Sequence, residues 1–217
     1  ISSRYDFLNH LLSLGIDIYW RKKFIENLKI QDGQIILDVA CGTGDIGFNI
    51  LKQNHIQLIN IDLSKNMLDI AKKKAQEKNL INIAFIQGDA EVLPLKDASV
   101  NCLTIAYGLR NIEHYKKALE EFYRVLKPGG ILGILEFSIP QSKIIGPIFT
   151  FYFHHILPWI GSLFSRSDAY RYLPESVNFF PSRDDICKQI IHSGFQSSRF
   201  IDLTFGVSTI FLGKKHE

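Results

Sequence analysis

A glycine-rich loop with acidic residues on either side is the part of this 217-residue chain most able to do chemistry. Gly42, Gly44 and Gly47 form the pattern G-x-G-x-x-G, which lets the backbone approach a ligand closely where a strand turns into a helix. Asp38 precedes the loop, and Asp62 follows it at the end of the next apolar run. An acid at that second position can bind both hydroxyls of a ribose. The pattern therefore predicts a nucleotide or nucleoside site.

The carboxylate of Asp38 distinguishes between two classes of ligand. A dinucleotide such as NAD would place a doubly negative pyrophosphate at the start of the helix, and a carboxylate nearby would repel it. S-adenosylmethionine carries no phosphate, and its ammonium and sulfonium groups would be attracted to Asp38. Asp89 and Ala90 follow the third apolar run, where an acid can accept a hydrogen bond from the adenine amino group. Three acids at successive strand ends favour S-adenosylmethionine over NAD as the cofactor.

Three alternatives stay open for this loop. The acids could cap the helices that follow them, because Asp is a favoured N-cap residue. The glycine pattern alone also fits an NAD-dependent oxidoreductase, and calorimetry with both cofactors separates that class from a methyltransferase. A non-catalytic protein that has kept the fold is the third alternative, and the intact loop and acids argue against it.

The loop and its acids need a parallel sheet to bring them together. The predicted strands, all short apolar runs, are at residues 35–39, 57–61, 83–87, 100–106, 131–137, 200–203 and 207–212. Helices are predicted at 4–30, from the candidate N-cap Ser64, at 111–126 and at 182–192, and residues 127–130 (KPGG) are predicted to stop the third of these and turn. The alternation predicts an α/β fold, a doubly wound and mostly parallel sheet with helices on both faces.

The bulk composition suits a globular protein and does not argue for a nucleic-acid partner. Apolar residues make up 46% and charged residues 22% of the chain, and the formal net charge is +3 with both signs scattered. Cys41, Cys102 and Cys187 lack metal-ligand spacing, which favours reduced thiols in a cytoplasmic protein. The chain starts at Ile1 without a Met, so we expect a short N-terminal piece to be missing, and no signal peptide is visible in what remains.

Residues 144–181 interrupt the alternation of strands and helices. Between Ile144 and Ser165 there is no Asp, Glu, Lys or Arg, and aromatic residues are frequent. The length approaches the ~20 residues of a membrane span, but glycine, proline and histidine residues within it argue against one. We expect the segment to cover an apolar site or to touch a membrane surface. The alternatives are the core of a long crossover connection or a dimer interface.

Several stretches resemble the signatures of one enzyme family. They are YDFLN at 5–9, SLG at 13–15, WR at 20–21, YGLRN at 107–111, RVLKPGG at 124–130, LEFS at 135–138 and YRYL at 170–173. With these stretches, the chain resembles the ubiquinone/menaquinone biosynthesis C-methyltransferases, of the demethylmenaquinone methyltransferase type, over nearly its whole length. The lysine–proline–glycine–glycine turn is common to many small-molecule methyltransferases, whereas the first and last stretches are more specific.

The resemblance implies a class I S-adenosylmethionine-dependent methyltransferase with a Rossmann-like, seven-stranded sheet and a mostly helical insertion after the fifth strand. It implies transfer of a methyl group to a ring carbon of a polyprenylated quinol, either demethylmenaquinol or 2-methoxy-6-polyprenyl-1,4-benzoquinol. An O- or N-methyltransferase of another small molecule is the alternative. Thr43, Asp62, Asp89 and Ala90 fall on the family's cofactor-contact positions. The full set expected to bind the cofactor is Asp38, Gly42, Thr43, Gly44, Asp62, Asp89, Ala90 and Ala106.

Two positions depart from the family pattern. Asp17 stands where relatives usually carry His, so no catalytic role of that His can be carried over to this chain. Ala106 stands where bacterial relatives often carry a Ser that touches the cofactor, so we expect one contact to be lost there.

Methylation of a ring carbon needs an activated ring oxygen. Loss of a hydroxyl proton pushes electron density onto the adjacent carbon, which then attacks the methyl group in line, and a fixed cation stabilises the oxyanion. Arg110, beyond the fourth strand, is the expected cation; its alternative role is a salt bridge to Glu113 or Glu120. Tyr5 is expected to close over the cofactor and His155 is a candidate base. Their alternatives are helix packing and a hydrogen-bonded core residue.

We expect one domain in four parts, with boundaries taken from these patterns. They are an N-terminal helical lid (1–30), a cofactor-binding core (31–137), an apolar aromatic substrate insertion (138–181) and a C-terminal helix with strands (182–217). The expected partners are the quinol and, transiently, a membrane surface, with a homodimer or a complex of quinone-biosynthesis enzymes as further alternatives. The expected location is the cytoplasm, peripheral to the inner membrane.

Overall fold

A computed structural model describes residues 15–142, 146–147, 151, 176–177 and 180–217 of the chain. Most of the insertion expected at 138–181 and the first half of the lid expected at 1–30 therefore lie outside the described residues. Tyr5 and His155 lie outside them as well.

The described part of the chain forms one seven-stranded sheet with the order β3-β2-β1-β4-β5-β7-β6. The strands are β1 (Ile35–Val39), β2 (Gln57–Asp62), β3 (Ile83–Gln87), β4 (Val100–Ala106), β5 (Leu126–Phe137), β6 (Ser197–Leu203) and β7 (Ser208–Lys214). Only β7 runs antiparallel to its neighbours among these pairs. The strand order reverses between β1 and β4, and open sheets of this kind bind ligands at such a switch point. The mostly parallel sheet predicted from the sequence is confirmed.

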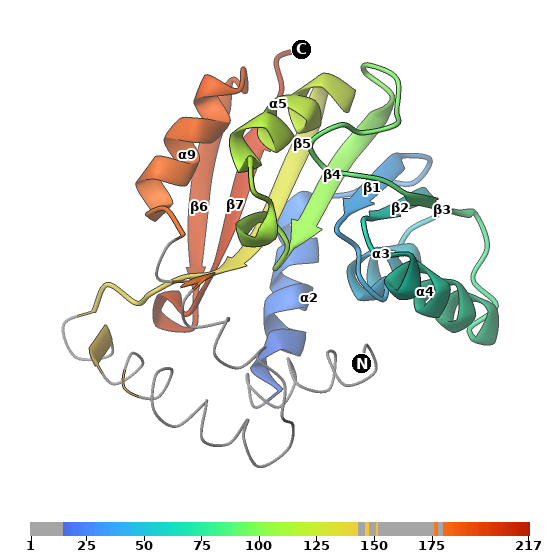
Figure 1. Cartoon of the computed structure of the whole chain (residues 1–217), viewed down its shortest axis with the longest axis horizontal. Helices are drawn as coiled ribbons and strands as arrows, with labels where there is room; N and C mark the ends of the chain where they lie inside the picture. Colours follow the sequence, from blue (N-terminus) through green and yellow to red (C-terminus); the bar gives the residue numbers. More distant parts are fainter. Residues whose placement is uncertain (1–14, 143–145, 148–150, 152–175, 178–179) are drawn as a thin grey trace.

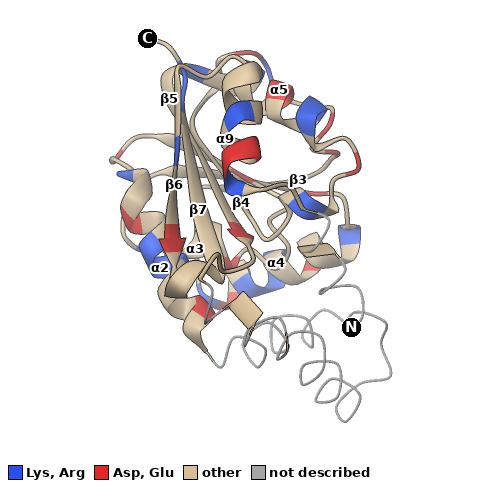
Figure 2. Ribbon diagram, turned by 90° about the vertical axis from the view of Figure 1, so that its left-hand side faces the viewer, with Lys and Arg blue, Asp and Glu red and all other residues tan. Residues whose placement is uncertain are grey.

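Helices cover both faces of the sheet (Figure 1). They are α2 (Ile16–Leu28), α3 (Asp45–Leu51), α4 (Lys65–Glu77), α5 (Tyr115–Val125) and α9 (Arg183–His192), with short 3-10 turns η1 (Leu109–Asn111) and η3 (Thr204–Gly206). Apolar residues of α2, α3 and α4 belong to one buried cluster and those of α5 and α9 to a second, so the sheet separates two cores. Charged residues of both signs are spread over the surrounding elements, in line with the small net charge (Figure 2).

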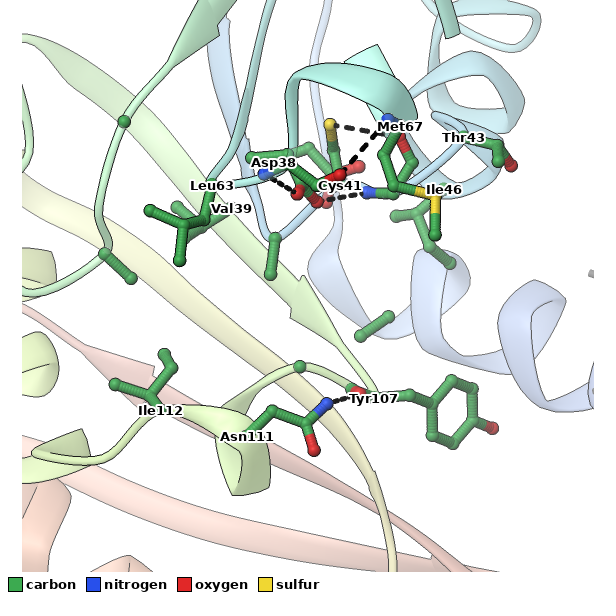
Figure 3. Close-up of a pocket in the computed structure, with 18 of the residues that line it drawn as sticks. Asp38, Val39, Cys41, Thr43, Ile46, Leu63, Met67, Tyr107, Asn111 and Ile112 are labelled. Carbon is green, nitrogen blue, oxygen red and sulfur yellow. Dashed lines mark hydrogen bonds between the residues drawn. The ribbon is translucent and has the colours of Figure 1, made fainter. Parts of the chain in front are cut away.

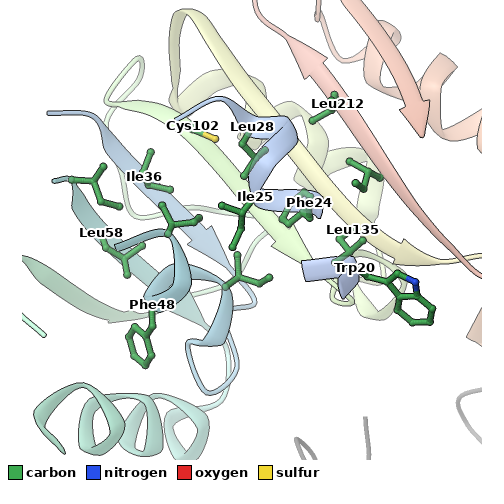
Figure 4. Packing of buried hydrophobic residues seen from close by; sticks show 14 of the residues in the cluster. Trp20, Phe24, Ile25, Leu28, Ile36, Phe48, Leu58, Cys102, Leu135 and Leu212 are labelled. Carbon is green, nitrogen blue, oxygen red and sulfur yellow. The ribbon is translucent and has the colours of Figure 1, made fainter. Parts of the chain in front are cut away.

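Helix α2 lies against the sheet through residues spaced four apart. Trp20, Phe24 and Leu28 are at most 3% exposed, and burial of each contributes roughly 1.5–3 kcal/mol. The helix approaches β5 closely because Gly133 has no side chain: a Cβ there would lie 2.3 Å from Cδ2 of Leu28. Figure 4 shows these side chains of α2 packed over the strands.

Two boundaries differ from those expected. The helix expected at 111–126 begins only at Tyr115, because residues 109–111 form the separate turn η1. The expected turn at 127–130 is part of β5, which begins at Leu126. The amide of Gly129 donates to the carbonyl of His216, and that of Lys215 to the carbonyl of Gly130. The stretch is an irregular part of the strand: it bulges out of the pairing with β4, where Val100 pairs with Leu126 and Cys102 with Ile131, and Gly129 has a left-handed φ of 71°.

One expectation is confirmed at the level of a single residue. The hydroxyl of Ser64 accepts a hydrogen bond from the amide of Met67 and caps α4, as predicted. The cysteines Cys41, Cys102 and Cys187 are free thiols. None of the helices within the described residues is both long and apolar enough to span a bilayer.

Candidate functional site

A cavity of about 500 Å³ opens at the carboxyl ends of β1, β2 and β4, at the switch point of the sheet. Its volume is within the range typical of small-molecule sites. Seven of the eight residues expected to bind a cofactor line it: Asp38, Gly42, Thr43, Asp62, Asp89, Ala90 and Ala106. In Figure 3, Tyr107, Asn111 and Ile112 lie across the cavity from Cys41 and Met67.

The eighth expected residue, Gly44, shapes the loop and does not line the cavity. It is the N-cap of α3, with a left-handed φ of 86°. A Cβ at this position would lie 2.5 Å from Cζ of Phe48, so a larger residue would have to displace that ring. Gly42 is also left-handed, with φ 55°. These glycines let the chain turn from β1 into α3 within a few residues.

Asp62 connects the end of β2 to the glycine loop. Its Oδ2 accepts a hydrogen bond from the amide of Gly42 at 2.8 Å, and its Oδ1 accepts one from the amide of Ser64 at 2.8 Å. Each carboxylate oxygen has a second lone pair for a further donor. The side chain therefore stiffens the loop and can still accept hydrogen bonds from a ligand in the cavity.

Asp38 is the most deeply buried acid of the cavity, at 1% exposure. Its Oδ1 accepts from the hydroxyl of Thr104 at 2.7 Å, and its Oδ2 accepts from the amide of Gly47 at 3.3 Å. Burial raises the pKa of Asp38 to about 7, although these two hydrogen bonds and the charge of Arg21 oppose the shift. The bond to Gly47 shows that Asp38 also supports the first turns of α3, as its helix-capping alternative would require.

The cavity is acidic among its described lining residues. Its acids are Asp38, Asp45, Asp62, Asp89, Glu91 and Glu113. Arg21 is the one basic side chain in the same described lining. Such a lining repels a pyrophosphate and attracts a cationic ligand. This distribution supports the reasoning that separates S-adenosylmethionine from NAD.

Arg21 is a cavity residue that sequence reasoning did not select. It comes from α2, where Asp17, Trp20 and Phe24 face the sheet. Its Nε lies 3.4 Å from Oδ2 of Asp17, and its Nη1 lies 3.6 Å from Oδ2 of Asp45. The available signal was the four-residue spacing from Asp17, which places two opposite charges on the buried side of an otherwise apolar helix face.

Arg110 is not at the cavity, in contrast to its expected position. Its Nη1 pairs with Oε1 of Glu136 on β5 and donates to the carbonyl of Tyr107 at 3.0 Å. Its side chain is 3% exposed, and its guanidinium lies 5.3 Å from the ring centre of Phe137. The ion-pair alternative named Glu113 and Glu120, and neither is the partner found. The physical reason is that Glu136, fully buried, needs a cation within reach.

Tyr107 is a second lining residue that sequence reasoning did not select individually. It has a left-handed φ of 56°, and its ring lies 4.5 Å from that of Phe137. Its hydroxyl is 3.3 Å from Oγ of Ser208, and burial raises its pKa. Burial likewise raises the pKa of Cys41, so this lining thiol is held neutral and is not a nucleophile.

Known proteins are similar to this chain in sequence and in fold. The sequence model of the ubiE/COQ5 methyltransferase family matches residues 1–215. The chain is 40% identical to the ubiquinone/menaquinone biosynthesis C-methyltransferase UbiE of Geobacter sulfurreducens, over 99% of this chain and 85% of that protein. It is 42% identical to the demethylmenaquinone methyltransferase of Deinococcus radiodurans, over 99% and 89%. A solved S-adenosylmethionine-dependent methyltransferase from Aquifex aeolicus has the same fold, with a TM-score of 0.66 and 18% identity over 89% of this chain and 88% of that one.

Proposed function

The chain belongs to the ubiE/COQ5 methyltransferase family and is an S-adenosylmethionine-dependent C-methyltransferase of quinone biosynthesis, and we propose that its acceptor is a ring carbon of a polyprenylated quinol. Demethylmenaquinol and 2-methoxy-6-polyprenyl-1,4-benzoquinol are the two candidate acceptors. One observation carries the proposal: relatives with these names match almost the full length of the chain, at 40% and 42% identity.

The cofactor is proposed to lie across the three strand ends. Asp62 would accept hydrogen bonds from the ribose hydroxyls, and Asp89 with Ala90 would bind the adenine. Asp38 would face the ammonium, since its carboxylate is buried next to the loop and needs a positive partner. S-adenosylmethionine, when bound, supplies an electrophilic methyl group. The protein residues hold it, orient it and keep water away from it.

The three residues expected to act in catalysis stay predictions. Arg110 pairs with Glu136, so its charge is already compensated and a role as the oxyanion partner would require that pair to open. Tyr5 and His155 lie outside the described residues. Tyr107 and Asn111 line the cavity after β4, and the amide of Asn111 donates to the carbonyl of Tyr107 at 3.4 Å.

The acceptor assay is direct. The protein is incubated with labelled S-adenosylmethionine and, separately, with each quinol, a soluble phenol and a soluble amine. We expect label only in the quinol products, on a ring carbon. Asp62→Asn serves as the matched variant, because it keeps the shape of the side chain and removes its charge; we expect it to weaken cofactor binding and slow transfer. Label in the phenol or amine and in neither quinol would support an O- or N-methyltransferase instead.

A transient membrane contact is part of the proposal, because a polyprenyl tail resides in a bilayer. The turn between β6 and β7 lies at the same sheet edge as the cavity, and Phe205 at its tip is 72% exposed. Thr204, Phe205 and Gly206 all have positive φ, a strained arrangement that costs of order 1–3 kcal/mol for each of the first two residues. Arg183 supports the turn, donating to the carbonyl of Gly206 at 2.8 Å.

Vesicle binding tests this contact. With vesicles of phosphatidylethanolamine and phosphatidylglycerol, we expect Phe205→Ser to lower the bound fraction in a flotation assay. Ile81→Ser is the matched control, because Ile81 is equally exposed, at 73%, but lies before β3 at the opposite sheet edge. If Phe205→Ser and Ile81→Ser lower the bound fraction equally, the turn between β6 and β7 is not the membrane contact. The homodimer and the quinone-biosynthesis complex stay predictions, for which sedimentation analysis is the measurement.

A further inference from the structure

Among the described lining residues of the cavity, Arg21 is the one basic side chain, and the proposed cofactor placement leaves it without a role. Arg21 lines the cavity, and its side chain is only 12% exposed. A buried charge is costly unless it is paired and hydrogen-bonded. A buried Arg21 therefore needs an anionic partner, and its contacts indicate what that partner is.

The contacts of Arg21 hold its position but leave its donors poorly used. The two ion-pair distances, 3.4 Å to Asp17 and 3.6 Å to Asp45, are longer than the 2.7–2.9 Å of a charge-assisted hydrogen bond. Its Nε is buried and makes no hydrogen bond to any described residue. A guanidinium has five N–H donors in a planar fork that matches a carboxylate. Arg21 can therefore accept another anion without first breaking a good hydrogen bond at Nε.

The nearby acids have other partners. Asp45 also pairs with Nζ of Lys74, at 3.2 Å, and Lys74 donates to the hydroxyl of Thr43 at 2.7 Å. The charge of Arg21 is close enough to Asp38 to lower the pKa of that carboxyl. One end of the cavity thus carries a buried cation and a buried carboxylate near each other, which suits a zwitterion.

We propose that Arg21 binds the carboxylate of the methionine part of S-adenosylmethionine, while Asp38 faces the ammonium. The inference rests on the proposed cofactor placement and deepens it. An amino-acid group has both charges on one carbon, so it needs an anion and a cation close together. Without Arg21 the described lining would offer the ligand carboxylate several acids and no basic side chain, and the acids would repel it.

Two nucleosides that differ in the amino-acid group test this assignment. S-adenosylhomocysteine carries the carboxylate and the ammonium, and 5′-methylthioadenosine carries neither. Calorimetry gives the dissociation constant of each for the unaltered chain, Arg21→Met and the control Arg124→Met. Arg124 is an ion-paired arginine of α5 that does not line the cavity.

We expect Arg21→Met to weaken S-adenosylhomocysteine binding by about 10- to 100-fold, as for the loss of a hydrogen-bonded charge pair, with 5′-methylthioadenosine affinity unchanged. Arg124→Met should leave both affinities unchanged. Because Arg21→Met removes the cation 3.4 Å from the buried Asp17, the double variant Asp17→Asn/Arg21→Met is measured too, and the same selective loss is expected. Arg21→Lys should recover part of the affinity, since it keeps the charge but not the fork.

Three results overturn the assignment. An unchanged affinity for S-adenosylhomocysteine in Arg21→Met and in the double variant means that the carboxylate binds elsewhere. An equal loss for the two nucleosides means that Arg21 only maintains the shape of the cavity. If the unaltered chain binds neither nucleoside, the cofactor placement itself fails. Binding of both nucleosides to the unaltered chain keeps the cofactor placement intact even where the assignment of Arg21 fails.

Discussion

Two carboxylates are buried near the carboxyl ends of β1 and β5, two strands that β4 separates, and their partners differ. Asp38 on β1 is 1% exposed and receives hydrogen bonds from a hydroxyl and an amide. Glu136 on β5 is fully buried and pairs directly with Arg110. Asp38 lines the cavity, whereas Glu136 does not. A buried acid that already has its cation is part of the framework, and one that has only neutral donors at the wall of a cavity is ready for a cationic ligand.

Removing the charge of Glu136 gives the largest expected effect. Glu136→Gln keeps the shape of the side chain and leaves Arg110 buried without its counter-charge, which should lower the free energy of unfolding by about 3–5 kcal/mol. Urea denaturation is the measurement. Asp38→Asn is the control, and should be neutral or stabilising, because it removes a buried charge that has no direct cationic partner. The contrast between the two carboxylates fails if both variants lose equal stability.

The next largest expected effect is a pH dependence of the unfolding free energy that comes from Asp38. The pKa of Asp38 is about 7 in the folded protein against 3.8 for an ordinary aspartate, so between these values the folded state holds a proton that the unfolded state has lost. The contribution of Asp38 to stability is therefore full below about pH 4 and is lost as the pH rises through 7, by up to about 4 kcal/mol.

The measurement is the unfolding free energy of the unaltered chain minus that of Asp38→Asn. This difference should fall from pH 4 to pH 7 and stay constant above it. A difference that is flat over the whole range would show that Asp38 is ionised in the folded protein throughout.

The ligand affinity of Asp38→Asn gives a smaller effect. At pH 8 we expect this variant to bind S-adenosylhomocysteine about tenfold more weakly, because the ammonium loses a full negative charge. At pH 6 the gap should narrow, since Asp38 of the unaltered chain is then largely protonated. Calorimetry at both pH values checks this, with 5′-methylthioadenosine as the ligand that should show no difference. A gap independent of pH would contradict the titration of Asp38.

The smallest expected effect concerns Thr104, which donates to Asp38 at 2.7 Å. Thr104→Val keeps the volume and removes the hydroxyl, so stability should fall by about 1 kcal/mol. The hydrogen bond lowers the pKa of Asp38, and its loss should raise that pKa further. In the Thr104→Val background, the pH above which Asp38→Asn weakens S-adenosylhomocysteine binding should therefore be higher. A shift toward lower pH would mean that the hydroxyl does not donate to the carboxylate.

Local patterns predicted most of the fold and of the cofactor site. Short apolar runs predicted the parallel strands β1 to β5, because a buried parallel strand is recognisable from its composition. The strand-end rule then placed Asp38, Asp62 and Asp89 at one edge, and all three line the cavity. Gly44 was grouped with them, although its contribution is to the turn into α3.

Contacts between distant segments could not be predicted in the same way. Glu136 lies 26 positions after Arg110, and the sequence does not show that β5 brings the two together. Sequence proximity favours Glu113 and Glu120 as partners of Arg110, and proximity in the sequence does not bring them to it in the fold. Arg21 was overlooked for a related reason: its approach to the cavity depends on how α2 crosses the sheet, which is a property of packing.

The way α2 crosses the sheet depends on the absence of a side chain at Gly133. Position 133 on β5 has no methyl group, and this absence lets Leu28 of α2 lie where the methyl would be. Arg21 is two helical turns away on the same rigid rod. An alanine at 133 would push the Leu28 end of α2 away from β5 and so change how deeply the Arg21 guanidinium lies in the cavity. Gly133 thus sets how far Arg21 extends toward its proposed ligand, although Gly133 contacts neither of them.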